Sequence, residues 1–372
     1  MIKVLHIISD LNKAGAQTVV MNIFRYLKND PELDMTIAVL VSPSNTEYEK
    51  EARDNNYRVR FCNFKPSNTI PILDMLLNWI QLQRTVYNII KDEKPDIVHT
   101  HSTALLPYVV FPIVFAGVKS RIHTLHSDPY AFSKRFVMWA KLAFKWLGFY
   151  PLCVSSVQAD KACRRYGVSN FKVIKNGIDE KRFVPSNNRQ VIRSILGVRD
   201  STFLVGSVGR LDKIKNYNFL LKIFSEYLNF NRDAFLVLIG EGDERKNLED
   251  KAKELGISNN ILLLGQKRDV EKYYYAMDLF MLTSFFESFS IVTVEAQFAG
   301  VRCVVADSIP EDVVITNKVN RLSLNEPIEK WIKAMQGLIN PDKQVGSLDD
   351  FSMNKTAIVL KKLYLSINEK AI

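Results

Sequence analysis

Short apolar segments alternate with segments of helical periodicity along most of the chain. Lys3–Ser9 and Met35–Val41 are apolar runs of strand length, and the segment between them carries apolar residues at helical spacing. Those residues are Val19, Val20, Ile23, Phe24 and Leu27. Strands that alternate with helices in this way are typical of a parallel sheet covered on both faces. The sequence therefore predicts an α/β fold.

The alternation stops once, at the polar run Val184–Gln190, which is typical of a linker. Strands are expected before this run at Asp96–His101 and Arg121–His126, and Phe171–Asp179 ends this half. After the run, strands that lead into a Gly turn are expected at Thr202–Arg210 and Ala234–Asp243. We expect two Rossmann-like, doubly wound domains, at residues 1–184 and 185–352, facing a cleft that holds the ligands. A C-terminal helix at residues 353–372 is expected to pack back on the first domain.

Cysteine usage and hydropathy favour a cytoplasmic chain. The four cysteines are scattered and form no C-x-x-C pair. The apolar run Val4–Ile8 is too short for a signal peptide. The 15 residues of Ala104–Val118 fall short of the ~20 that span a bilayer, so we expect a buried helix there.

The net charge of +10 is concentrated in one segment of the chain. Residues 119–175 contain 11 Lys and Arg against two Asp and Glu, whereas residues 185–372 are nearly balanced. Such an excess indicates an anionic partner, either a nucleic acid or a membrane surface. No nucleic-acid-binding motif accompanies the charge, so we expect no nucleic-acid partner.

The segment Tyr130–Leu152 combines eight aromatic residues with four cations and no acid. At helical spacing Lys134, Lys141 and Lys145 lie on one stripe. Trp139, Trp146 and Phe136 are suited to anchoring at a lipid interface. We interpret the segment as a helix that holds the protein on the inner face of an anionic plasma membrane. The alternative is a core helix with one solvated basic face.

Two pairs of charged residues carry the candidate chemistry in the second half. Arg210 and Lys215 follow a strand and open a helix, where the helix dipole disfavours cations unless they serve an anion such as a diphosphate. Glu287 lies in a loop after another strand, and Glu295 lies within the helix expected at Ile291–Phe298. A carboxylate on so apolar a helix needs hydroxyl or amine partners, and sugar hydroxyls are suitable. The alternative for Arg210 and Lys215 is a solvated basic helix start.

The spacings E-x7-E and R-x4-K resemble those of the retaining glycosyltransferases of GT-B fold, family 4. Further stretches resemble this family: Ala14–Ile23 with its Gly loop, Ile122–Asp128 with a strand-end His, Val173–Asp179 with N-G-x-D, Leu238–Asp243 and Leu262–Asp269. The resemblance covers about residues 1–320 and is closest to bacterial capsule and exopolysaccharide transferases. It implies that the first domain binds an acceptor and the second a nucleotide-sugar donor.

The resemblance also implies roles for single residues. The implied catalytic residues are His126 beside the sugar, Glu287 facing it, and Arg210 and Lys215 on the leaving diphosphate. The implied donor-binding residues are Gly15, Arg210, Lys215, Gly240, Arg268, Ser290, Ile291 and Glu295. Glu295 would bind the ribose, and Arg268 would lie near the base. His99 and His101 are expected to be hydrogen-bonded structural residues rather than catalysts.

The implied reaction moves a sugar, with retention, from a nucleotide-sugar such as a UDP-sugar to a lipid-linked or saccharide acceptor. The chain contains no D-x-D motif, so Arg210, Lys215 and a helix N-terminus are expected to replace the metal, and no cofactor is expected. Ser288 and Ser290 stand where the family usually has Gly, and Gln17 where it has Glu. Two alternatives stay open: a nucleotide-sugar epimerase of similar fold and a non-catalytic partner subunit. An NAD-dependent oxidoreductase is disfavoured because no strand is followed by G-x-G-x-x-G.

Overall fold

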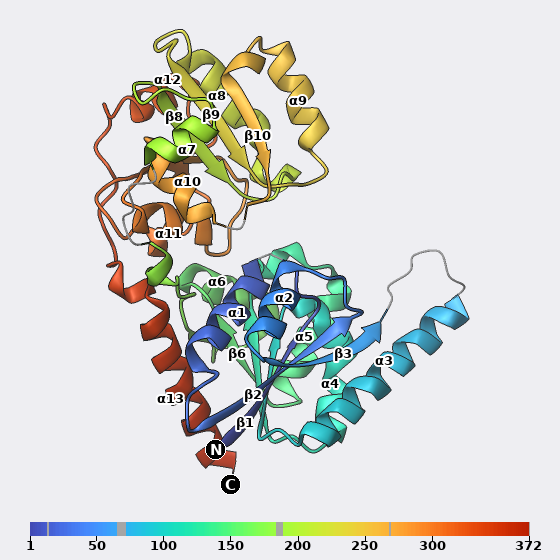
Figure 1. Cartoon of the computed structure of the whole chain (residues 1–372). Helices are drawn as coiled ribbons and strands as arrows, with labels where there is room; N and C mark the ends of the chain where they lie inside the picture. The colour runs from blue at the N-terminus through green and yellow to red at the C-terminus, as the bar shows by residue number, and fades with distance from the viewer. Residues whose placement is uncertain (13–14, 65–71, 184–188, 268, 372) are drawn as a thin grey trace. The chain divides into compact units, whose positions relative to one another are not determined.

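The computed structural model describes residues 1–12, 15–64, 72–183, 189–267 and 269–371 (Figure 1). The chain divides into two compact units, one of Met1–Gly177 with Met353–Ile372 and one of Ile178–Ser352. The predicted boundary at 184/185 therefore differs from the structural one at 177/178. The reason is local: the N–H of Ile178 donates to the carbonyl of Phe351 at 2.7 Å, and Ile178 also forms a bridge with Ser352.

The first unit is built on a seven-stranded parallel sheet with the order β3-β2-β1-β4-β5-β6-β7. Its strands are β1 (Ile2–Ile8), β2 (Leu33–Val41), β3 (Arg58–Phe64), β4 (Ile97–His101), β5 (Ser120–Leu125), β6 (Phe149–Cys153) and β7 (Lys172–Val173). Its helices are α1 (Gly15–Leu27), α2 (Glu47–Asp54), α3 (Ile72–Glu93), α4 (Leu106–Phe115), α5 (Lys134–Lys145), α6 (Ser156–Ala162) and α13 (Met353–Ala371).

Helices α3, α4 and α5 bury one face of this sheet. Val86 of α3, Val110 of α4 and Ala140 of α5 belong to one core with Leu5 and Ile7 of β1. The apolar stretch that was too short to span a bilayer supplies α4, which is buried as expected. None of the described helices is long and apolar enough to cross a membrane.

The second unit is built on a six-stranded parallel sheet with the order β10-β9-β8-β11-β12-β13. Its strands are β8 (Phe203–Val208), β9 (Ala234–Ile239), β10 (Ile261–Gly265), β11 (Leu279–Leu282), β12 (Arg302–Ala306) and β13 (Val319–Leu322). Its helices are α7 (Arg189–Ile195), α8 (Tyr217–Tyr227), α9 (Arg245–Glu254), α10 (Val270–Ala276), α11 (Ile291–Phe298) and α12 (Ile328–Met335). The predicted architecture of two doubly wound α/β domains is confirmed.

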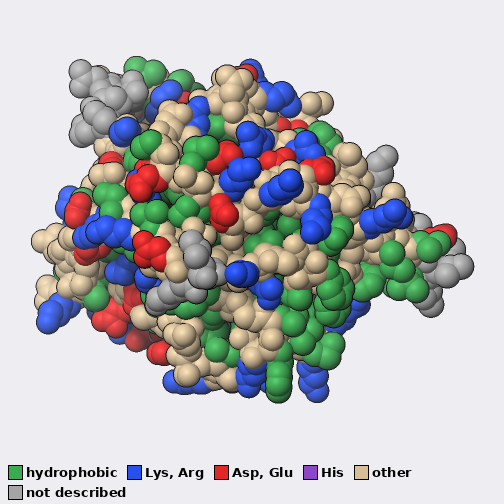
Figure 2. All heavy atoms as spheres, turned by 90° about the horizontal axis from the view of Figure 1, so that it is seen from below, with side chains coloured by type: hydrophobic (Ala, Val, Ile, Leu, Met, Phe, Trp, Pro, Cys, Tyr) green, Lys and Arg blue, Asp and Glu red, His purple; other side chains and the backbone are tan. Residues whose placement is uncertain are grey.

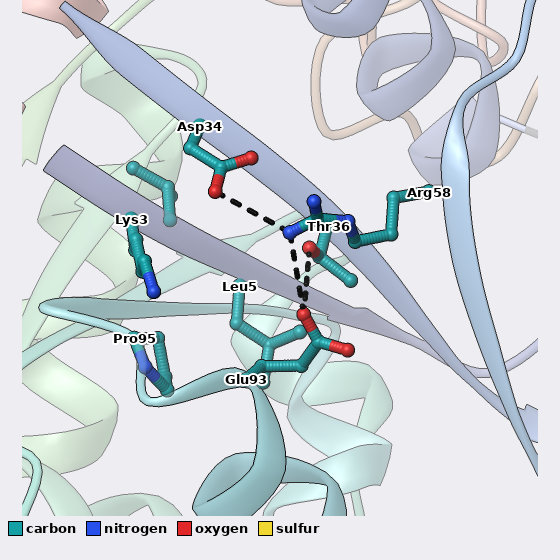
Figure 3. Close-up of a pocket in the computed structure, with 8 residues that line it drawn as sticks. Lys3, Leu5, Asp34, Thr36, Arg58, Glu93 and Pro95 are labelled. Carbon is teal, nitrogen blue, oxygen red and sulfur yellow. Dashed lines mark hydrogen bonds and ion pairs between the residues drawn. The ribbon is translucent and has the colours of Figure 1, made fainter. Parts of the chain in front are cut away.

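In both units the strand order reverses direction at one point, between β1 and β4 in the first and between β8 and β11 in the second. Loops that leave the carboxyl ends of two such strands diverge, which opens space for ligands. The amino-terminal edge of the first sheet carries ion pairs instead. There Arg58 bridges Asp34 at 3.3 Å and Glu93 at 3.5 Å beside a small pocket (Figure 3). The carboxyl edges are therefore the expected place for ligand chemistry.

The last helix, α13, completes the first unit although its sequence follows the second. It packs on α1 and reaches β5. Lys361 of α13 forms ion pairs with Asp30 at 2.7 Å and with Glu32 at 2.6 Å. Tyr364, one turn further on, is fully buried.

Candidate active site

Four candidate residues of the second unit, Arg210, Lys215, Glu287 and Ser290, lie on two loops at its reversal point. One loop, residues 209–216, follows β8, and the other, residues 283–290, follows β11. The loops are joined by hydrogen bonds: Phe285 N–H donates to the Ile214 carbonyl at 2.8 Å, and Thr283 Oγ1 donates to the Asn216 carbonyl at 3.0 Å. Two adjacent parallel strands thus hold both loops in a fixed relation.

Lys215 and Glu287 form an ion pair across these loops. Lys215 Nζ donates to Glu287 Oε1 at 2.6 Å, and Ser284 Oγ donates to the same oxygen at 2.8 Å. The two charged side chains are only 18% and 12% exposed. Asp212 shapes the first loop by accepting from the Lys215 N–H and from Arg210 Nε, yet the Arg210 side chain stays 73% exposed. Of the two predicted cations, Lys215 is thus fixed and Arg210 is exposed.

Helix α11 begins directly after the second loop, as the sequence predicts. Ser290 stands at its N-cap with a φ of 67°, a conformation that favours glycine. Its hydroxyl does not cap the helix but contacts Thr293 Oγ1 at 2.8 Å. The N–H groups of Thr293 and Val294 donate to the Ser290 carbonyl, so those of Ile291 and Val292 are left in the first turn to bind an anion.

Glu295 lies on α11 and is 8% exposed. The hydroxyl of Tyr274, from α10, donates to its Oε2 at 3.0 Å. Burial, together with the nearby Glu295 carboxylate, holds the pKa of Tyr274 well above its ordinary value, so this donor keeps its proton. Sequence reasoning missed Tyr274, because no local pattern marks a tyrosine whose partner lies on another helix.

The two predicted donor-binding glycines have different surroundings. A Cβ added at Gly240 would lie 1.9 Å from the Gly209 carbonyl oxygen, so close packing of the two backbones already requires glycine there. A Cβ added at Gly15, the first residue of α1, would meet no described atom within 4 Å. Packing therefore does not explain Gly15. Arg268 lies outside the described residues.

The predicted sugar-side histidine, His126, follows β5 at the carboxyl edge of the first sheet. Its Nε2 contacts His101 Nδ1 at 3.0 Å, and burial lowers its pKa to about 4. His99 and His101 are buried and hydrogen-bonded, in line with the structural role expected for them. Ser102, directly after β4, has a φ of 82°, an unusual conformation for a serine.

The predicted membrane-facing segment contains α5, whose outer side carries the exposed Lys134, Lys141 and Lys145. Trp139 is partly buried and packs edge-on against Phe111 of α4. Trp146, just after the helix, is 79% exposed instead. Neighbouring helices of the same unit expose further large apolar side chains. These are Met75, Leu76, Leu77 and Ile80 of α3, Phe115 of α4 and Met138 of α5.

Two family models match the chain. The model described as Glycosyltransferase Family 4 matches residues 14–182, and the model described as Glycosyl transferases group 1 matches residues 188–352. The two matches divide the chain much as its two sheets do.

Curated relatives match over nearly the whole chain. The putative glycosyltransferase EpsF of Bacillus subtilis is 27% identical, over 90% of this chain and 86% of its own length. An Escherichia coli protein is also 27% identical, over 95% of this chain and 92% of its own length. The name of that protein is UDP-Gal:alpha-D-GlcNAc-diphosphoundecaprenol alpha-1,3-galactosyltransferase.

Solved structures share the fold at low sequence identity. Anabaena HepE, crystallised with UDP and glucose, superposes with a TM-score of 0.76 at 18% identity, over 100% of this chain and 98% of its own. Sucrose-phosphate synthase of Thermosynechococcus elongatus superposes with a TM-score of 0.80 at 16% identity, over 99% of each chain.

Proposed function

Because the chain belongs to the glycosyltransferases that combine a family 4 domain with a group 1 domain, we propose that it is a retaining, metal-independent transferase. In this proposal it moves a hexose from a UDP-sugar to a lipid-linked or saccharide acceptor during synthesis of a cell-surface polysaccharide. The names of its relatives support the donor and acceptor classes. The Escherichia coli relative is named for UDP-galactose and a diphosphoundecaprenol-linked acceptor, and HepE was crystallised with UDP.

The observation that carries the proposal is the Lys215–Glu287 pair next to the N-terminus of α11. Cleavage of a nucleotide–sugar bond puts negative charge on a diphosphate. A fixed ammonium and free helix N–H groups are donors that stabilise such a charge without reorganisation, and the exposed guanidinium of Arg210 is a further donor. Their convergence at the sheet's reversal point favours phosphate chemistry over a solvated basic helix start.

Each residue then has a definite task. Lys215, oriented by Glu287, and Arg210 bind the diphosphate oxygens and stabilise the charge as the sugar leaves. The N–H groups of Ile291 and Val292 bind the same oxygens. The Glu295 carboxylate, held by Tyr274, accepts hydrogen bonds from ribose hydroxyls. His126 lies beside the transferred sugar, and the leaving phosphate accepts the proton of the acceptor hydroxyl on the same face of the sugar.

A screen of nucleotide-sugars tests this function directly. Uridine and guanosine sugars are tested for thermal stabilisation of the protein, and those that bind are then tested for slow donor hydrolysis. We expect a UDP-sugar to stabilise the wild type, and Glu295→Ala to weaken this effect. Stabilisation by no nucleotide-sugar would refute the proposal, and conversion of the sugar without transfer or hydrolysis would favour an epimerase.

Metal independence has its own test. The Lys215 and Arg210 cations replace a divalent ion in this proposal, so turnover is expected to survive excess EDTA. Loss of turnover in EDTA that returns with Mg²⁺ or Mn²⁺ would show that the two cations are insufficient.

We also propose that the first unit attaches to an anionic membrane surface. The lysines of α5 supply charge, and the exposed apolar side chains of α3, α4 and α5 supply area for burial among lipids. Figure 2 shows a face on which hydrophobic side chains gather, with Lys and Arg side chains at the border. This location would bring the first unit close to a lipid-linked acceptor.

A further inference from the structure

All five histidines of the chain lie on β1, β4 and β5 or directly after them. Residues two apart on a strand share a face, and the register pairs His6 with His99 and His101 with Thr124. His6, His99, His101 and Thr124 therefore lie together on one face of the sheet. All four are buried.

These residues form one continuous hydrogen-bonded chain that ends at His126. His126 Nε2 contacts His101 Nδ1 at 3.0 Å, and His101 Nε2 contacts His6 Nδ1 at 3.0 Å. Tyr364 of α13 then connects His6 Nε2, at 3.3 Å, to His99 Nδ1, at 2.8 Å. His99 Nε2 contacts Thr124 Oγ1 at 2.7 Å. We call this chain from Thr124 to His126 the histidine relay.

Each contact in the histidine relay needs one hydrogen, which only one of its two partners supplies. A neutral imidazole has a single N–H, and a phenol or hydroxyl has a single O–H. Burial lowers the pKa of His6 to about 3 and that of His101 well below its ordinary value, so these rings are neutral. If both His99 and His6 donated to the Tyr364 oxygen, the phenol hydrogen would be left unpaired at a fully buried residue. The hydrogens must therefore all point the same way along the relay.

The Thr124 end selects the direction. Within the described residues the Thr124 hydroxyl has one partner, His99 Nε2. If the relay pointed toward Thr124, the hydroxyl hydrogen would lack an acceptor at a side chain that is only 7% exposed, an arrangement that buried polar groups rarely show. If the hydrogens point the other way, Thr124 donates to His99 Nε2, and each ring of the relay donates through its Nδ1. The last of these donors is His101, which donates to His126 Nε2. His126 is then left with its hydrogen on Nδ1.

We propose that His6, His101 and Tyr364 are positioning residues that fix the tautomer of His126, so that this residue presents an Nδ1–H donor to a sugar hydroxyl. The proposal rests on the proposed function for the role of the sugar, but the tautomer itself does not depend on it. His126 is partly exposed, and its Nδ1 has no hydrogen-bond partner within the described residues. The C-terminal helix thus acts on the site through Tyr364.

The test is the ¹⁵N spectrum of the histidine rings, in which protonated and unprotonated nitrogens are well separated. Only five histidines contribute signals, and His126→Gln assigns those of His126. In the wild type we expect a hydrogen on His126 Nδ1 and none on Nε2. Tyr364→Phe breaks the relay in the middle and is expected to mix the two tautomers of His126. Tyr166→Phe, a buried tyrosine of the same unit outside the relay, is the matched control and should leave them unchanged.

Thr124→Val tests the relay at its other end without changing α13, and is also expected to lower the hydrogen population at His126 Nδ1. In donor turnover, Tyr364→Phe should lose roughly tenfold relative to Tyr166→Phe, a loss at the low end of that seen when the partner orienting a metal-bound imidazole is removed. Hydrogen on Nε2 in the wild type, or an unchanged His126 spectrum in both variants, would overturn the proposal. A shifted tautomer with unchanged turnover would do so too.

A bound metal would give a different result. One ligand atom each of His6, His99 and His101 lie within 4.8 Å of one another. A metal ion on these atoms would occupy lone pairs that the histidine relay uses as acceptors. Elemental analysis of the purified protein should therefore find no stoichiometric transition metal, and one tightly bound ion per chain would overturn the relay.

Discussion

Lys215 Nζ lies 2.6 Å from Glu287 Oε1, and this contact joins two loops that are 72 positions apart in sequence. The acid holds the ammonium at the reversal point of the second sheet, while Ser284 satisfies the same carboxylate oxygen. The pair therefore combines two effects that mutations can separate: it links the loops, and it places a positive charge next to the N-terminus of α11.

Lys215→Met is expected to lower turnover by about 10²–10³, the typical cost of losing one charge-stabilising donor. It should also lower the melting temperature, because Glu287 stays behind as a poorly solvated charge without its ion-pair partner. The double variant Lys215→Met with Glu287→Gln removes that charge, so stability should return while turnover stays low. Thermal unfolding and initial rates measure the two effects.

Lys272 offers a control for this experiment, since it forms an ion pair with Asp269 at the surface of the same unit. Lys272→Met should change neither rate nor stability by much. Recovery of turnover in the Lys215/Glu287 double variant would contradict the assignment of Lys215 to the diphosphate.

The two glycines are expected to respond in opposite ways to alanine. Gly15→Ala has room for its methyl group, so the protein should keep its melting temperature but lose affinity for the donor. Gly240→Ala forces a Cβ against the Gly209 carbonyl, and we expect a clear loss of stability. Thermal unfolding together with donor KM distinguishes the two. A normal KM for Gly15→Ala would remove Gly15 from the donor site.

Membrane attachment predicts that Lys134, Lys141 and Lys145 act together. Each contributes about 1 kcal/mol near an anionic surface, so changing all three to Glu should release the protein from phosphatidylserine vesicles in flotation assays. Binding of the wild type should weaken in high salt without vanishing, because apolar side chains such as Trp146 remain buried in the lipid.

The matched control for this variant makes the same charge change in the second unit, at the exposed Lys222, Lys246 and Lys253. It should float with vesicles as the wild type does. Equal flotation of both triple variants would mean that the basic face of α5 serves another purpose.

The buried histidines predict an acid-sensitive fold. Burial lowers the pKa of His6 and of His123 to about 3 and that of His126 to about 4, so the unfolded chain binds protons more readily than the folded one. Their contribution to stability is fully present above about pH 6.5 and falls as the pH drops from there toward 4, by up to about 1.4 kcal/mol per pH unit for each residue.

Urea unfolding between pH 7.5 and 5 measures this slope. His123→Phe should reduce the slope by the contribution of one histidine, because His123 lies outside the histidine relay and packs against Phe144. A free energy of unfolding that stays constant over this range would show that the histidines bind protons as readily in the folded protein as in the unfolded chain.

The sequence predicted the sheets, the helix at Ile291–Phe298 and the positions of Lys215, Glu287 and Glu295, because these follow from local periodicity and from motif spacing. From the sequence, Ser290 was known only to stand where the family usually has glycine. Its φ of 67° depends on how the loop joins β11 to α11, which no local pattern shows. Ser288 does not share that conformation.

Contacts between segments that are far apart in the chain could not be predicted from the sequence. Tyr364 lies 265 positions from His99, and no pattern around it distinguishes this tyrosine from others in a C-terminal helix. Trp139 was expected at a lipid interface, yet its ring packs on Phe111 because α4 lies beside α5. Gly240 was expected to bind the donor, but close contact with the Gly209 carbonyl already requires a glycine at this position.

The path of the chain between its two units has a consequence for engineering. Residues 178–352 form an insertion in the first unit, whose two flanks meet: a Cβ on Gly177 would lie 2.6 Å from the Cα of Met353. A chimaera that exchanges residues 178–352 would replace the second sheet as a whole and leave α13, with Tyr364, on its own partner. A chimaera cut only once, anywhere in the linker, would import a foreign C-terminal helix and with it a foreign residue at the hydrogen-bonded centre of the first sheet.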